Sequence, residues 1–181
     1  RYWREYLRRP HPTVETIQRF LVKAAQEFGV PVEILQAIGQ VENNWTQIGP
    51  SIDQGWGIMH LVQNNYADTL TEAANLLGVS AQLLRDDARQ NIRGGAALLA
   101  NYAGGPRNSF TQLEEWFEAV KQLSGLIDDE LREMQAKRYY EVMKTGVVSS
   151  TLWGETIRLE AHPEINLSSR SIRRNIRSAD Y

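Results

Sequence analysis

Residues 42–61 read ENNWTQIGPSIDQGWGIMHL, and this stretch decides how the rest of the chain is interpreted. Its first residue, Glu42, follows Leu35 by seven positions and Ile38 by four, so a helix ending here places the carboxyl group on an apolar face. A carboxyl group at that place is partly shielded from water, which favours the neutral form that a general acid needs. More often, a glutamate at the end of a helix turns outward to solvent or pairs with an arginine. The residues that follow Glu42 must therefore decide between the two interpretations.

Helical patterns lie on both sides of this stretch. The spacing of apolar residues and the capping signals predict helices over 13–28, 31–43, 58–63, 68–77, 81–85, 88–102, 111–124 and 128–145. Thr111 and Glu114 fit a capping box for one of them. Residues 147–160 fit a short strand pair or an irregular return, and no segment alternates long enough to build a core from sheet. We therefore predict an all-α fold, or an α fold with a minor β element, with one domain over 14–160.

Composition and charge exclude several classes of protein. The 181 residues include 20 Lys and Arg, 22 Asp and Glu, and no Cys, which excludes a disulfide scaffold, a thiolate metal site and a cysteine nucleophile. The net charge of −2 hides an acidic body, 24–166, between basic ends. Such a distribution does not resemble a nucleic-acid reader, and no apolar run reaches the roughly 18–20 residues of a membrane span. We expect residues 1–13 to be a basic segment and 161–181 a basic tail or linker.

The opening stretch resembles the catalytic segment of the soluble lytic transglycosylase family. This family belongs to the lysozyme-like superfamily and cleaves the glycan strand of peptidoglycan. Its pattern is a Glu at a helix end, an aromatic residue three positions on, a Ser nine positions on, and then Gly-Leu-Met-Gln. Here those positions hold Glu42, Trp45, Ser51 and the run GIMH at 57–60. A second family motif, Asn-Ile and then small residues opening a helix, is matched by NIRGGA at 91–96.

The resemblance covers roughly residues 14–145 and implies a lysozyme-like, goose-type helical domain with a substrate cleft. It implies that Glu42 protonates the glycosidic oxygen between N-acetylmuramic acid and N-acetylglucosamine, and then acts as base on the muramic acid 6-hydroxyl to close a 1,6-anhydro ring. Ser51 would orient the sugar's N-acetyl group or Glu42. No metal or other cofactor is implied. The partner would be peptidoglycan, which implies an extracellular or cell-envelope location, and the abrupt end at Tyr181 suggests a further wall-acting or wall-binding domain in a longer protein.

Several other residues are candidates for contact with the glycan. His60 stands where the family has Gln, and it could bond the sugar or Glu42 and add pH dependence near neutrality. Asp53 could hold a water for hydrolysis with inversion, although an aspartate that bonds its own backbone is commoner in turns. The remaining candidates come from the two motifs or are aromatic residues able to stack on sugars: Gly57, Met59, Asn91, Trp56, Tyr66 and Tyr102. The three histidines, at 11, 60 and 162, lack metal-ligand spacing.

Two aromatic positions of the family pattern are missing, since the chain has Leu98-Leu99 and Gln122-Leu123-Ser124 there. Three functions therefore stay open. The first is a lytic transglycosylase, and the second is a lysozyme-type hydrolase of the same fold. The third is a module that binds glycan without cutting it. The retained Glu42 argues against the third, because a buried carboxyl group destabilises a fold unless it is hydrogen-bonded.

Overall fold

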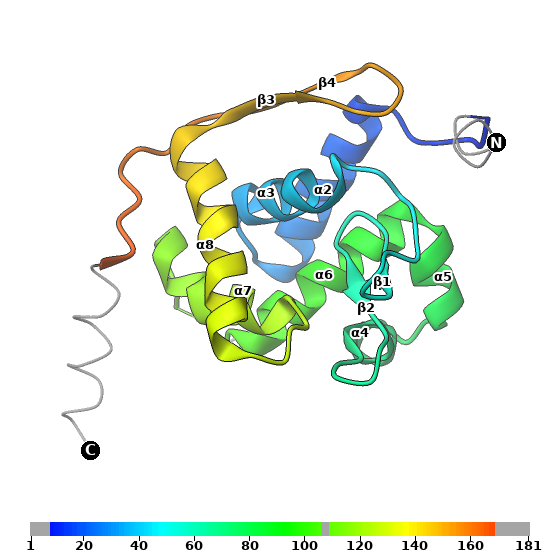
Figure 1. Cartoon of the computed structure of the whole chain (residues 1–181), viewed down its shortest axis with the longest axis horizontal. Coiled ribbons are helices and arrows are strands. Elements are labelled where there is room, and N and C mark those ends of the chain that lie inside the picture. The colour runs from blue at the N-terminus through cyan, green and yellow to red at the C-terminus, as the bar shows by residue number, and fades with distance from the viewer. Residues whose placement is uncertain (1–7, 106–108, 169–181) are drawn as a thin grey trace.

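The structure, a computed structural model, describes residues 8–105 and 109–168, and it is mainly helical with two short antiparallel sheets (Figure 1). Its helices are α2 (Val14–Phe28), α3 (Val32–Asn43), α4 (Thr69–Leu77), α5 (Ala81–Asp86), α6 (Ala88–Tyr102), α7 (Phe117–Leu123) and α8 (Asp129–Thr145). The sheets pair β1 (Gly55–Trp56) with β2 (Leu61–Val62), and β3 (Val147–Ser150) with β4 (Thr156–Leu159). The prediction of a helical fold with a minor β element is confirmed. Within the described ranges, no helix is both long enough and apolar enough to cross a membrane.

Helix α6 is the element on which much of the fold packs, because it contacts α2, α4, α5 and α7. Two glycines in its first half allow close approach. A Cβ atom added at Gly95 would lie 2.6 Å from Cγ of Met59, and one added at Gly94 would lie 3.1 Å from a methyl group of Leu61. Because Gly94 and Gly95 have no side chain, the turn between β1 and β2 can pack directly on the backbone of α6.

Helix α3 packs against α8, as Figure 1 shows near the centre of the molecule. Helix α3 ends because Asn44 adopts a left-handed conformation, with φ of 49°, and its N–H bonds back to the carbonyl of Gln40. Asp128 caps the start of helix α8, because its side chain accepts the N–H groups of Glu130 and Leu131. The packing of these two helices places Glu42, one residue before the end of α3, against the side of α8.

The helix predicted over 58–63 is wrong. Residues 57–60 form a tight turn between β1 and β2, in which the N–H of His60 donates to the carbonyl of Gly57. Gly57 has a φ of 74° and His60 a φ of 49°. Two residues in the left-handed region cannot continue a right-handed helix. The apolar spacing of Ile58 and Met59 reflects burial of a turn, since both are in the core.

The helix predicted from Thr111 also begins differently. Glu115, and not Glu114, accepts the backbone N–H groups of Thr111 and Gln112, and a 3-10 turn over Leu113–Trp116 precedes α7. The predicted capping box is therefore displaced by one residue.

Both ends of the described chain are held against the body. Ile165 is buried in the core and the N–H of His162 donates to the carbonyl of Met143, so the folded domain continues past the predicted boundary at 160. At the other end, the His11 ring stacks on Trp153 at the tip of the β3–β4 hairpin, with centroids 4.0 Å apart. The remainder of the two predicted basic segments, 1–7 and 169–181, lies outside the described residues.

His11 is held as a neutral imidazole. Its Nδ1 lies 2.9 Å from the carbonyl oxygen of Pro12, which can only accept, so Nδ1 carries the proton. Its Nε2 accepts the N–H of Gln47 at 3.0 Å. Burial lowers the pKa of His11, outweighing the opposite effects of the Pro12 carbonyl and the Glu155 carboxylate.

Asn91 fixes the segment that carries the opening stretch. It is fully buried, its Oδ1 accepts the N–H of Met59 at 2.8 Å, and its Nδ2 donates to the carbonyls of Trp56 and Leu84. A Cβ atom at Gly57 would lie 2.2 Å from this amide. The structure thus gives Asn91 and Gly57 structural roles in place of the predicted contacts with substrate.

Lowering the pH should destabilise the fold through His11. The unfolded chain takes up a proton on this residue at higher pH than the folded chain, so stability falls as pH drops below about 6.5. The free energy of unfolding, measured by denaturant titration, should therefore decline less steeply between about pH 7 and pH 5 in His11→Gln than in the wild type. Equal slopes in the two proteins would contradict this role of His11.

Replacing Asn91 should strongly destabilise the domain. Asn91→Ala removes the side-chain partner of the Met59 N–H and of the Trp56 carbonyl, while the Leu84 carbonyl keeps the Gln47 amide, and the free energy of unfolding should fall by about 2–4 kcal/mol. Asn75→Ala, on the exposed face of α4, is the matched control and should change it by less than about 0.7 kcal/mol. A loss at Asn91 no larger than that at Asn75 would show that the amide does not anchor the turn.

Candidate active site

The carboxyl group of Glu42 is held between α3 and α8. Its Oε1 atom accepts hydrogen bonds from Nε2 of Gln135 and from the hydroxyl of Tyr139, which lie one turn apart on α8. Only 13% of the Glu42 side chain is exposed, so these donors replace water on one of the two carboxyl oxygens. Sequence reasoning placed Glu42 correctly on a partly buried face of α3.

Tyr139 serves as a fixed proton donor. Burial raises the pKa of Tyr139 well above its usual value near 10, and the adjacent charge of Glu42 adds to the rise. The phenol therefore keeps its proton near neutral pH and donates a hydrogen bond to Glu42. Both donors bond Oε1, so Oε2 is the oxygen of Glu42 that can exchange a proton with another group.

His60 and Ser51 lie on the Oε2 side of Glu42. Nδ1 of His60 is 3.7 Å from Oε2, and Nε2 of His60 is 2.8 Å from Oγ of Ser51. Oγ of Ser51 also accepts the N–H of Gly55 at 2.9 Å. The structure therefore brings together three of the predicted site residues, in the order Ser51, His60, Glu42.

A hollow of about 180 Å³ opens beside His60. Asp53 and Tyr66 line it on the side of the β1–β2 segment, and Ile127 and Leu131 line it on the side of α8. Tyr66 is 70% exposed and Ile127 is 64% exposed, so both offer apolar surface to a ligand. Asp53 and Tyr66 thus share one hollow with His60.

The other predicted contacts lie elsewhere. Met59 is almost fully buried and packs beneath His60, where Ile38 and Tyr139 line the same small cavity. Tyr102 sits near the end of α6 and donates its hydroxyl to Glu72 of α4, so it belongs to helix packing. For these two residues the structural interpretation fits better than the predicted contact with glycan.

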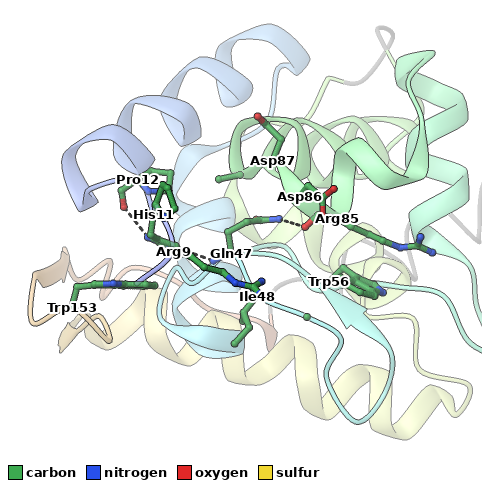
Figure 2. Close-up of a pocket in the computed structure, with 13 residues that line it drawn as sticks. Arg9, His11, Pro12, Gln47, Ile48, Trp56, Arg85, Asp86, Asp87 and Trp153 are labelled. Atoms are coloured by element: carbon green, nitrogen blue, oxygen red, sulfur yellow. Dashed lines mark hydrogen bonds between the residues drawn. The ribbon is translucent and has the colours of Figure 1, made fainter. Parts of the chain in front are cut away.

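Trp56 faces a different cavity, of about 580 Å³, which Figure 2 shows. In this view His11 and Trp153 lie at one side of the cavity, and Trp56 and Arg85 at the other. The guanidinium of Arg85 lies over the ring of Trp56, 5.1 Å from its centroid, and a Cβ atom at Gly49 would lie 2.6 Å from the same ring. Trp56 therefore borders this cavity and not the hollow beside His60.

Sequence reasoning missed the contribution of α8. Gln135 and Tyr139 both contact Glu42, and neither is among the site residues that the sequence predicts. The available signal was the spacing itself, because polar groups four residues apart on a buried helical face require a polar partner. Nothing in the sequence identified that partner as Glu42, which lies 97 residues away.

No protein-family model matches this chain, and no curated protein matches it either, so the likeness to lytic transglycosylases stays a prediction carried by the site.

Proposed function

We propose that this protein is a peptidoglycan lytic transglycosylase in which Glu42 is the single catalytic acid and base. The proposal is supported by the surroundings of the Glu42 carboxyl group. Glu42 is partly buried at the end of α3, two donors from α8 hold one of its oxygens, and the other oxygen faces His60 beside an open hollow. The proposal includes a lysozyme-like fold and a location outside the cytoplasm, where peptidoglycan is found.

The chemistry needs one proton that leaves Glu42 and returns to it. The protonated carboxyl group donates its proton to the glycosidic oxygen between N-acetylmuramic acid and N-acetylglucosamine, and the bond to the muramic acid C1 breaks. The resulting carboxylate then takes the proton of the muramic acid 6-hydroxyl, whose oxygen bonds to C1. No water is consumed and the acid is restored. Gln135 and Tyr139 donate to Oε1 throughout, so Oε2 is the oxygen that exchanges the proton.

Hydrolysis by the same site is the second candidate, and the position of Asp53 favours it. Asp53 lines the hollow beside His60, so a water molecule held there would have a carboxylate next to it. The two reactions break the same glycosidic bond with the same acid. They differ in whether water enters the product.

Glu42→Gln should abolish cleavage while the fold is kept. The amide has nearly the shape of the carboxyl group and can still accept the hydrogen bond of Tyr139, but it cannot deliver a proton. The release of soluble fragments from purified peptidoglycan should fall by at least about 10²–10⁴-fold. The circular dichroism spectrum should stay unchanged.

Glu33→Gln is the matched control, because Glu33 lies in the first turn of the same helix and Glu42 in its last. This variant should cleave at the rate of the wild type. Full activity of Glu42→Gln, or an equal loss in both variants, would show that Glu42 is not the acid.

A further inference from the structure

The residues around the His60 ring fix its position. Gly55 lies against it so closely that an added Cβ atom would be 2.2–2.5 Å from three atoms of the imidazole. The φ of Gly55 is outside the left-handed region, so the need for glycine here comes from the space that the ring occupies. Oγ of Ser51 then fixes Nε2 from the other side, and His60 itself adopts a left-handed backbone conformation.

In this position, the Nδ1 atom of His60 points toward Oε2 of Glu42. Among the described residues, no other Lys, Arg or His comes within 4.0 Å of the Glu42 carboxylate. The distance of 3.7 Å between Nδ1 of His60 and Oε2 of Glu42 is too long for a hydrogen bond, so the interaction between these two groups is one of charge. When the imidazole is protonated, both ring nitrogens carry hydrogen, and the ring becomes a cation next to the carboxylate.

We propose that His60 is a positioning residue that controls the protonation of Glu42, holding it as a carboxylate whenever the imidazole is charged. This rests on the proposed function, in which the protonated form of Glu42 starts the reaction. A charged His60 favours the ionised carboxyl group and so withholds the acid. As the pH falls, the wild-type enzyme gains less activity than a variant in which an uncharged residue replaces His60. His60 thereby limits cleavage on the acid side of neutrality.

Within the described part of the chain, four ionisable groups border the His60 ring or share a cavity with it. Glu42 faces it from α3 and Tyr139 from α8, while Asp53 and Tyr66 line the hollow beside it. Tyr139 keeps its proton, because burial raises the pKa of this phenol well above the usual value. Asp53 is exposed, so water screens its charge. Of these groups, Glu42 is therefore the partly buried carboxyl group whose charge acts most directly on the His60 ring.

The first test is the titration of His60, followed by NMR of its ring resonances in the full chain. The chain has only two other histidines, His11 and His162, so single replacements assign the signals. In Glu42→Gln the midpoint of the His60 titration should move to lower pH by at least about half a unit, because the stabilising anion is gone. Asp53→Asn should move it less.

A matched control tests the other histidine–glutamate pair. Nδ1 of His162 lies 3.5 Å from Oε1 of Glu164, a largely exposed side chain. Glu164→Gln should leave the His60 titration unchanged. An identical His60 midpoint in the wild type and in Glu42→Gln would overturn the proposal.

The second test is the pH dependence of peptidoglycan cleavage by His60→Gln. The ratio of its kcat/KM to that of the wild type should rise at least about threefold between pH 8 and pH 5, the range in which histidine changes charge. Gly55→Ala, which displaces the ring, should change the profile in the same direction. A merely structural role would reduce the rate equally at every pH, so a constant ratio would overturn the proposal.

The two tests separate the inference from the function on which it rests. Failure of the wild type to cleave peptidoglycan at any pH would contradict the proposed function. In that event the NMR titration still decides whether Glu42 and His60 are coupled.

Discussion

A carboxyl group withdrawn from water must find hydrogen-bond donors in the protein, and this constraint at Glu42 shapes the centre of the structure. Helix α3 carries the carboxyl group, and α8 supplies Gln135 and Tyr139 to it. The packing of α3 on α8 is thus both an apolar contact and a polar one. It fixes one oxygen of Glu42 and leaves the other toward His60, which gives the two oxygens different roles.

A second polar residue supports the first. The buried amide of Asn91 bonds three backbone groups and so holds the turn between β1 and β2 against α6. That turn carries His60, whose ring lies in the space left by Gly55. Asn91 and Gly55 touch no candidate reacting atom, yet they set where the imidazole lies relative to Glu42. The proposed reaction therefore depends on buried residues that do not themselves line the hollow.

Local signals predicted much of the fold and a smaller part of the site. Thr13, Ser80 and Asp128 cap α2, α5 and α8 as their side chains suggest, because capping depends on residues near in sequence. The turn at 57–60 was mistaken for a helix because apolar spacing reports burial and not backbone conformation. Glu42, Ser51 and His60 were found together because they lie within one loop and its flanks. Tyr139 was missed as a partner of Glu42 because their contact is set by the packing of distant helices.

The central claim is that Glu42 cleaves a glycosidic bond without water. The masses of the fragments released from purified peptidoglycan by the wild-type chain test it most directly. Muramic acid ends that carry a 1,6-anhydro ring, each lighter by one water molecule than a reducing end, are the predicted result. Reducing ends alone would contradict the account and favour hydrolysis, while strands that are bound but left intact would contradict any catalytic role for Glu42.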